Sequence, residues 1–457
     1  MPAVEDPLLP TTEPPEISDE AKLRGLPWQL AQNVLNAVFA SLTVFGSVFL
    51  LFLDELGLPK TQIGLLLSLM PFAGLLALWS SPVATRLGRR RVFLVCWAAR
   101  KAVVAGLLLL PWVLDRYGHT AGLMYLTGIV ALFSVLRSVA ETAWYPWYQE
   151  VIPNRLRGRF GANSTVLTTI FTCIAVVVAG RVLEASEGLD GFLLLIGVGC
   201  VIGLVGTAVM VPVPGGAPRP DVGARRNHLA NMLGCLRDAN FVSYLAGFGS
   251  MTLGTLAYLT FLPLFLKDRL GLAPGTVVTM ETAVMVGSAL SALLWGRAAD
   301  RVGSRPVLMT AAALLVLIPL GWLLLPRQTP HLLVICGLLY FLHGMAFIGC
   351  SMGAGRLLLN GVVPPAQSTA YMALYYAWQG LVGGAAPLLA GALLQAYEPW
   401  EGHCAWFTLD GHAALFMLAG VLIGLGWACH ARVRPDDRYR TRDVLHALTD
   451  RLFHRLR

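Results

Sequence analysis

Twelve apolar stretches alternate with short polar connections along the chain, six on each side of a polar middle. A helix needs about 20 mostly apolar residues to cross the hydrocarbon core of a bilayer. The stretches that meet this requirement are 29–53, 61–82, 92–114, 121–147, 162–183, 191–213, 241–266, 275–295, 306–326, 331–356, 367–396 and 412–430. The pattern therefore predicts an all-α membrane protein with twelve transmembrane helices in two six-helix bundles.

The segments outside the spans divide the chain further. Residues 27–213 and 241–431 are predicted to form the two bundles, joined by a cytoplasmic linker over 214–240. Residues 1–26, rich in proline and acid, predict a disordered cytoplasmic tail. Residues 432–457 place leucines at helical spacing among arginines, which predicts a basic amphipathic cytoplasmic tail on the inner membrane surface.

Composition and charge agree with a membrane location. Hydrophobic residues make up 56% of the 457 and charged residues only 13%, too little charge for a soluble protein of this size. The connections on the side of the two termini hold 25 Lys and Arg residues, against 6 on the other side. The positive-inside rule therefore predicts that both termini are cytoplasmic.

The same distribution accounts for the net charge of +8, so nucleic acid is not predicted as a partner. Arginine outnumbers lysine by 30 to 4, which is typical of a GC-rich prokaryotic genome and points to the cytoplasmic (cell) membrane. Three Gly-x-x-x-Gly pairs within the spans predict close helix contacts: Gly199/Gly203, Gly380/Gly384 and Gly420/Gly424.

The chain contains an internal sequence repeat. A basic turn at 296–305 has a degenerate copy at 81–90, 215 positions earlier, and residues 264–272 match 51–58 at an offset of 213. Matching offsets in the two halves indicate parallel repeats of six helices. Paired membrane repeats are how many secondary transporters build a site that faces either side.

The turn Gly296-Arg-Ala-Ala-Asp300-Arg-Val-Gly-Ser-Arg305 resembles the signature of the major facilitator superfamily, and the resemblance covers about residues 27–431. It implies a monomeric alternating-access carrier whose two bundles rock about a central site. It also implies that the basic turns act as cytoplasmic latches. The corresponding gating residues here are Gly88, Arg89, Arg90, Gly296, Asp300, Arg301, Gly303 and Arg305.

The two copies of the turn differ. The N-terminal copy has Ser81 and Thr85 where the signature has Gly and Asp, so the stronger gate is expected in the C-terminal half. Asp300 is expected to act there, against an arginine of the 155–159 loop. The alternative is that these arginines only set membrane topology.

Ionisable side chains inside the spans are the best indicators of a solute site, because they are costly in lipid. On the fourth span the polar and aromatic side chains share one helical face: Arg137, Glu141, Trp144, Tyr145 and Tyr148. We expect Arg137 to pair with Glu141 and to engage an anionic or hydrogen-bonding solute, with Glu141 as the candidate for proton coupling. The alternative is a structural ion pair.

Weaker candidates come from other spans. Gln29, Gln32, Asn33 and Asn36 share a face of the first span. The C-terminal half contributes His343, Glu281 towards the external end of the eighth span, and Tyr375, Trp378 and Gln379 of the eleventh. Arg100 and Lys101 of the third span are expected to extend towards the inner interface, outside the site.

An enzyme is not predicted. None of the four lysines follows a glycine, which excludes a P-loop, and the cysteines form no metal-binding pair, so no cofactor or metal is expected. The predicted function is secondary active transport of a small organic solute, with protons and membrane lipids as further partners. Two alternatives stay open: a transporter-like receptor or scaffold, and a lipid or lipophile mover. The sequence does not indicate the solute.

Overall fold

The computed structural model describes residues 17–76, 80, 86–153, 156–218, 234–326, 329–364, 368–398, 402–403 and 408–435. Within them, ten helical segments are long and apolar enough to cross a membrane, and Lys60–Leu76 is a shorter apolar helix. The longest segment, Arg89–Val151, holds two of the predicted spans, because the chain departs from helical geometry at Gly118 (φ 79°). Each of the twelve predicted spans therefore contains a helix.

The first half of the chain supplies the elements α1 (Asp19–Leu42), α2 (Gly46–Glu55), α3 (Lys60–Ala73), η1 (Gly74–Leu76), α5 (Arg89–Ala105), η2 (Gly106–Leu109), α6 (Leu110–Val151), α7 (Arg157–Glu184) and α8 (Asp190–Ala208). The second half supplies η4 (Cys235–Arg237), α10 (Ala239–Leu264), η5 (Phe265–Arg269), α11 (Pro274–Val302), α12 (Ser304–Leu323), α13 (Leu332–Leu357), η6 (Leu358–Val362), α14 (Ser368–Ala396), β1 (Gly402–His403), β2 (Thr408–Leu409) and α15 (Gly411–His430).

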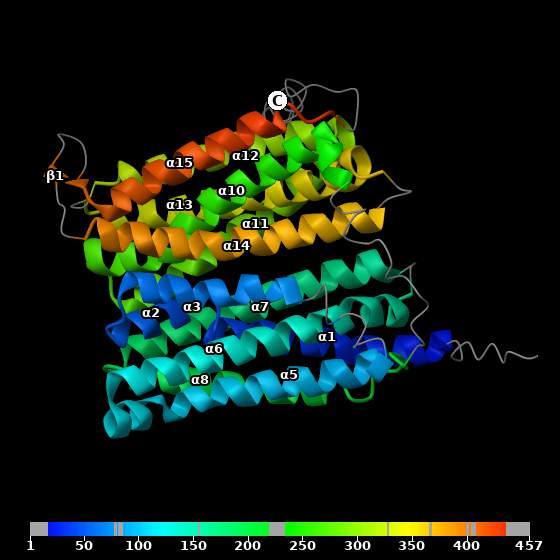
Figure 1. Cartoon of the computed structure of the whole chain (residues 1–457), viewed down its shortest axis with the longest axis horizontal. Helices are drawn as coiled ribbons and strands as arrows, with labels where there is room; N and C mark the ends of the chain where they lie inside the picture. Colours follow the sequence, from blue (N-terminus) through cyan, green and yellow to red (C-terminus); the bar gives the residue numbers. More distant parts are fainter. Residues whose placement is uncertain are drawn as a thin grey trace, which may run out of the picture.

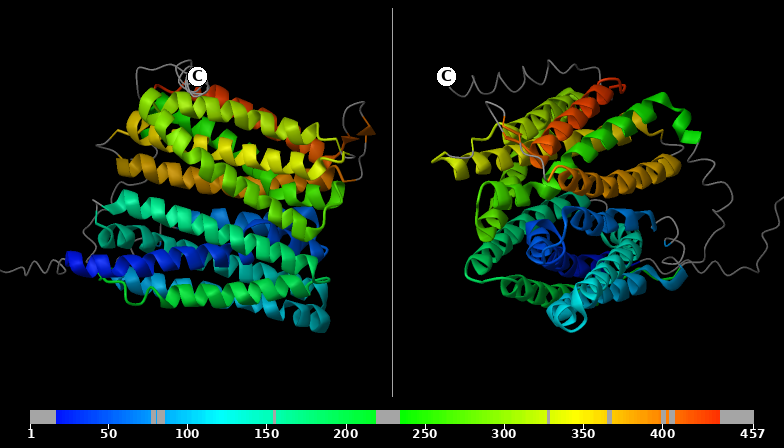
Figure 2. Two further views of the ribbon diagram at one scale, coloured as in Figure 1. Left: turned by 180° about the vertical axis from the view of Figure 1, so that it is seen from behind. Right: turned by 60° about the vertical axis from the view of Figure 1, so that its left-hand side comes forward.

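The helices gather into two layers. Figure 1 shows α1 to α8 in the lower half of the molecule and α10 to α15 in the upper half, and the views in Figure 2 keep the same separation. We call these halves the N-bundle and the C-bundle. The only strands among the described residues, β1 and β2, form a two-residue antiparallel pair between α14 and α15.

The bundles meet chiefly along two helix pairs, α3 with α14 and α7 with α11, and α2 also contacts α10 and α11. Glycines bring the backbones together at both: a Cβ on Gly64 would lie 2.3 Å from the carbonyl oxygen of Pro387, and one on Gly180 would lie 2.7 Å from that of Gly275. In lipid, where apolar surface alone does not drive helices together, such close packing is a main source of helix association.

The outward surface of the bundles is apolar. Met124, Leu290, Leu293 and Val334 are among the large hydrophobic side chains that are two-thirds exposed. Exposure on this scale suits lipid as the surrounding solvent. The structure is that of a multi-pass membrane protein.

The first membrane helix is broken. α1 ends at Leu42, the hydroxyl of Thr43 turns back to the carbonyl oxygen of Phe39, and α2 begins at Gly46 with φ 74°. A left-handed backbone is easily adopted only by glycine, so Gly46 lets the chain re-enter a helix within four residues. The break leaves the N–H groups of the first turn of α2 without partners in their own helix.

The N-terminal tail is shorter than predicted. α1 begins at Asp19, with the Ser18 side chain accepting a hydrogen bond from the backbone of Ala21, so residues 19–26 are helical rather than disordered. A serine cap followed by Asp19 and Glu20 in the first turn favours a helix start here. Residues 1–16 and the basic tail after 435 lie outside the described residues.

Candidate functional site

Arg137 and Glu141 form the predicted pair on α6. The Arg137 Nε lies 2.7 Å from Glu141 Oε1, with the two side chains 29% and 39% exposed. The guanidinium also lies 4.9 Å from the ring centroid of Phe45, at the break between α1 and α2. The pair therefore stays accessible and is linked to the break in the first helix.

The aromatic side chains predicted to share this face diverge. Trp144 stacks on Phe93 of α5 at 4.9 Å between ring centroids and packs within the N-bundle. Tyr145 is 68% exposed. Tyr148 lies against Trp144 and Phe160. Counted from Arg137, these side chains follow at i+4, i+7 and i+8, a spread wide enough around the helix for them to face different neighbours. Trp144 faces the core of the N-bundle.

The amides of α1 are turned into the N-bundle. Asn33 donates to the hydroxyl of Ser164 on α7 at 3.0 Å, and the Asn36 Oδ1 accepts from Arg100 at 2.5 Å. Gln29 and Gln32 are buried, and their Oε1 atoms find no hydrogen-bond partner among the described residues. Unpaired buried carbonyls are costly, and these two oxygens are free to accept a hydrogen bond.

The expectation that Arg100 and Lys101 extend to the membrane interface is wrong. Both are buried, at 2% and 0% exposure. The Arg100 guanidinium lies 3.2 Å from the ring centroid of Trp97 and bonds Asn36, while the Lys101 Nζ donates to the hydroxyl of Thr207 at 2.9 Å. The prediction expected water at the membrane interface to solvate these two charged groups. Aromatic faces and hydroxyl oxygens inside the bundle take that place instead.

The C-bundle candidates are mostly packed. His343 is buried, and its Nδ1 lies 2.6 Å from the hydroxyl of Tyr258. Tyr375 packs on Phe248, and the Trp378 Nε1 donates to the carbonyl oxygen of Leu245. Gln379 is exposed. The structure thus brings polar groups together mainly in the N-bundle.

The N-terminal basic turn is fastened within its own bundle. Gly88 (φ 93°) precedes α5 and packs against Pro218. Arg90 donates from its backbone to Gly216 at 3.2 Å and from its guanidinium to the carbonyl oxygen of Val211, and Arg89 lies 3.9 Å from Glu150. Residues 81–85, with the departures Ser81 and Thr85, lie outside the described residues.

The C-terminal turn is also fastened within its bundle. Asp300 pairs with Arg356 at 2.5 Å, and Arg305 donates to the carbonyl oxygen of Ala431. Gly303 (φ 84°) joins α11 to α12, Gly296 lies beside Met352, and Arg301 is exposed. The Asp300 partner is therefore an arginine of its own bundle; Arg155 and the side chain of Arg157 lie outside the described residues.

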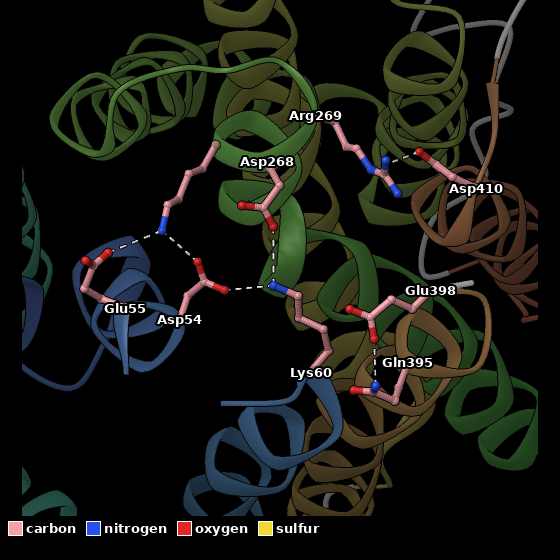
Figure 3. Close-up of polar contacts among 9 residues, drawn as sticks. Asp54, Glu55, Lys60, Asp268, Arg269, Gln395, Glu398 and Asp410 are labelled. Atoms are coloured by element: carbon pink, nitrogen blue, oxygen red, sulfur yellow. Dashed lines mark hydrogen bonds and ion pairs between the residues drawn. The ribbon is translucent and has the colours of Figure 1, made fainter. Parts of the chain in front are cut away.

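A network of charges joins the bundles at the opposite end, which the positive-inside rule predicts to be external (Figure 3). Asp54 lies 2.8 Å from both Lys60 and Lys267, Lys267 lies 3.5 Å from Glu55, and Lys60 lies 3.3 Å from Asp268. Lys267 and Asp268 stand on the π-helical turn η5. We call these five residues the external charge network.

Sequence reasoning did not select the external charge network. A signal was present, because the repeat aligns Asp54 with Lys267, and the two therefore carry opposite charges at equivalent positions. A surface pocket of about 370 Å³ adjoins the network. None of the predicted site residues lines it, and its lining is Asp54, Gly57, Leu58, Pro59, Lys60, Gln395 and Glu398.

A family model described as Major Facilitator Superfamily matches residues 34–387 and 270–447. The chain belongs to the Major Facilitator Superfamily. This family and the helical membrane fold make it a transporter and not an enzyme. A search of curated proteins gives no match.

Solved structures share the fold. A variant of the nucleoside transporter NupG matches with a TM-score of 0.69 at 14% identity, over 91% of this chain and 100% of that chain. A bacterial homologue of the iron transporter ferroportin in an inward-facing state matches at 0.66 and 15%, over 91% and 99%. A D-xylose–proton symporter matches at 0.66 and 15%, over 91% and 97%. At these identities the likeness concerns the fold alone.

Proposed function

We propose that this protein is a secondary active transporter that moves a small polar organic solute by rocker-switch alternating access, with both termini in the cytoplasm of a prokaryotic cell. The single observation that carries the proposal is the accessible Arg137–Glu141 pair beside the break in the first membrane helix. Charged groups inside membrane helices are costly, and they commonly mark solute and ion pathways.

The surroundings of the pair support a polar solute. Arg100, Asn36 and Asn33 add a guanidinium and two amides to the interior of the N-bundle. Guanidinium and amide groups recognise carboxylates, hydroxyls and carbonyls through directed hydrogen bonds. In the proposed binding step, the solute takes the place of Glu141 on Arg137.

The arrangement of the bundles supports alternating access. The ion pairs that join the bundles among the described residues belong to the external charge network, and the described contacts of the basic turns at the other end lie within one bundle. Bundles that are held together at the predicted external end are suited to separate at the cytoplasmic end. The D-xylose–proton symporter and NupG, which share the fold, are transporters of polar organic solutes by their names.

The proposal is tested by a thermal-shift screen of the purified protein against sugars, nucleosides, organic acids, amino acids, lipophilic cations and lipids. A ligand at about 100 times its Kd should stabilise the folded protein by about 2.7 kcal/mol. We expect one polar class to stabilise the native protein and to lose this effect in Arg137→Ala. The control is Arg24→Ala, since Arg24 is 78% exposed on α1.

Each result has a definite meaning. Stabilisation by a polar class that survives in Arg137→Ala would contradict the role of the pair. Stabilisation by lipids alone would favour the lipid mover, and no stabilisation by any class would favour the scaffold. Uptake of the identified solute into proteoliposomes then establishes transport itself.

A further inference from the structure

Glu281 of the C-bundle caps the broken first membrane helix of the N-bundle. Its Oε1 accepts a hydrogen bond of 2.9 Å from the backbone N–H of Ser47 and a second, short one from the Ser47 hydroxyl. A Cβ on Gly46 would lie 3.1 Å from the Glu281 Oε2, so the glycine leaves room for the carboxylate. An acidic side chain of one bundle thus completes a helix terminus of the other.

The carboxylate has an unusual set of neighbours for a charge at membrane depth. Its hydrogen bonds among the described residues come from Ser47, without a lysine or arginine. Tyr340 of α13 interacts with it electrostatically. The charged side chain that α6 places at the break is Arg137, whose guanidinium lies over the Phe45 ring. The positive end of the α2 dipole and its N–H groups therefore stabilise the anion.

The cap also connects to the proposed solute site. Phe45, Gly46 and Ser47 are consecutive, with Arg137 of the N-bundle on Phe45 and Glu281 of the C-bundle on Ser47. A solute that pulls Arg137 away from Phe45 acts on the same three-residue segment that Glu281 holds. The broken helix is a physical link between the solute site and the contact between bundles.

We propose that Glu281 is a proton-binding site that controls the contact between the bundles, an inference that rests on the proposed function for its link to solute movement. The ionised carboxylate accepts both Ser47 hydrogen bonds and holds α2. A proton taken from water forms an O–H bond on the carboxylate, removes its charge from the helix terminus and weakens both bonds. The bundles then separate at the break, and loss of the proton to water restores the cap.

Geometry favours Glu281 over Glu141 in this role. Glu141 pairs with Arg137 on its own helix, so a proton on Glu141 changes a contact within the N-bundle. Glu281 bonds across the bundles, so a proton there changes the contact that must break during alternating access.

The test measures the distance between the bundles without any solute. Nitroxide labels are attached at one pH to the Glu184→Cys/Thr276→Cys pair in a chain whose native cysteines are replaced. In the native protein the Thr276 hydroxyl donates to Glu184 across the bundles at 3.2 Å. Pulsed EPR at mildly acidic and mildly alkaline pH should show the separated population rising in acid, on the order of tenfold relative to the joined one, a typical coupling.

Variants show which carboxylate causes the response to pH. Glu281→Gln, which is permanently neutral, should give the separated population at both pH values, and Glu281→Asp, which still titrates, should keep the response to pH. Glu20→Gln, at an exposed carboxylate of α1, should respond like the native chain. A distance distribution that ignores pH, or a response that survives in Glu281→Gln, would overturn the inference. Because no solute is present, its failure leaves the outcome of the ligand screen unaffected.

Discussion

Asp54 and Lys267 occupy equivalent positions in the two repeats, 213 residues apart, and form an ion pair of 2.8 Å across the bundles. Each closes the first membrane span of its half. In a parallel repeat, equivalent positions lie opposite one another about the axis between the halves. Residues of the same charge at these two positions would repel each other, whereas Asp54 and Lys267 carry opposite charges and attract.

The Asp54–Lys267 pair should contribute to stability in proportion to its partial burial. In a double-mutant cycle of Asp54→Asn and Lys267→Gln, we expect a coupling energy of about 1 kcal/mol, the upper end for pairs near a surface. The side chains are 13% and 24% exposed, so salt should weaken the coupling only in part. Thermal unfolding at low and high salt measures both quantities.

The Glu20–Arg24 pair serves as the control for this cycle. Its side chains are 75% and 78% exposed at i, i+4 spacing, so its coupling should amount to a few tenths of a kcal/mol and vanish in salt. If the two pairs gave equal coupling energies, the external charge network would have no special part in joining the bundles.

Gly46 should be less replaceable than Gly57, although both have positive φ, of 74° and 71°. Alanine in a left-handed conformation costs about 1–2 kcal/mol at either position. No atom lies within 4 Å of a Cβ on Gly57, whereas a Cβ on Gly46 would press on the Glu281 carboxylate. Gly46→Ala should therefore lower the melting temperature more than Gly57→Ala, and equal losses would mean that the cap contributes nothing.

Lys101→Met should stabilise the protein. The lysine is fully buried and its described hydrogen bond goes to Thr207, whose hydroxyl also donates to the carbonyl oxygen of Gly203 and so keeps a partner. A buried amine carries a desolvation cost that an apolar side chain of similar volume avoids, so we expect a gain of about 1 kcal/mol. Thermal unfolding should show a rise for this variant.

Arg100→Met is the comparison for the buried lysine. It removes the donor to Asn36 and leaves that amide oxygen unpaired, so its gain should be smaller or absent. A lower melting temperature for Lys101→Met than for the native protein would instead indicate that Lys101 has an unrecognised counter-charge.

The fold was predictable from the sequence because lipid permits few backbone conformations in a membrane-spanning segment. A backbone in hydrocarbon must satisfy its hydrogen bonds within the segment, so apolar length alone fixes helices. The family match and the ten described spanning helices agree with that prediction. The break at Thr43–Phe45 was not predicted, since single small and polar residues such as Thr43 and Gly46 also occur inside unbroken membrane helices.

The site was only partly predictable, because helical spacing gives a face but not its neighbour. Arg137 and Glu141 pair as expected, while Trp144 on a similar face packs inside the bundle. The Gly-x-x-x-Gly motif shows the same limit. Gly380 and Gly384 contact Pro71 and Phe72 as predicted, but no atom lies within 4 Å of a Cβ on Gly420 or Gly424, so close contact at that pair is not found.

Gly180 should be needed for the bundles to meet along α7 and α11. A Cβ there would lie 2.3 Å from the Thr279 hydroxyl and 2.7 Å from the Gly275 carbonyl oxygen, and a backbone oxygen cannot move without its helix. Gly180→Ala should therefore push α11 away from α7 and destabilise the joined state.

Gly128→Ala is the matched control, because Gly128 lies in α6 with no atom within 4 Å of a Cβ. Alanine is favoured over glycine inside a helix by about 0.5–1 kcal/mol, so this variant should be slightly more stable than the native chain. The EPR distance between labels at 184 and 276 should lengthen in Gly180→Ala and stay unchanged in Gly128→Ala. An unchanged distance in both would show that the α7–α11 contact tolerates a methyl group and does not limit how closely the bundles approach.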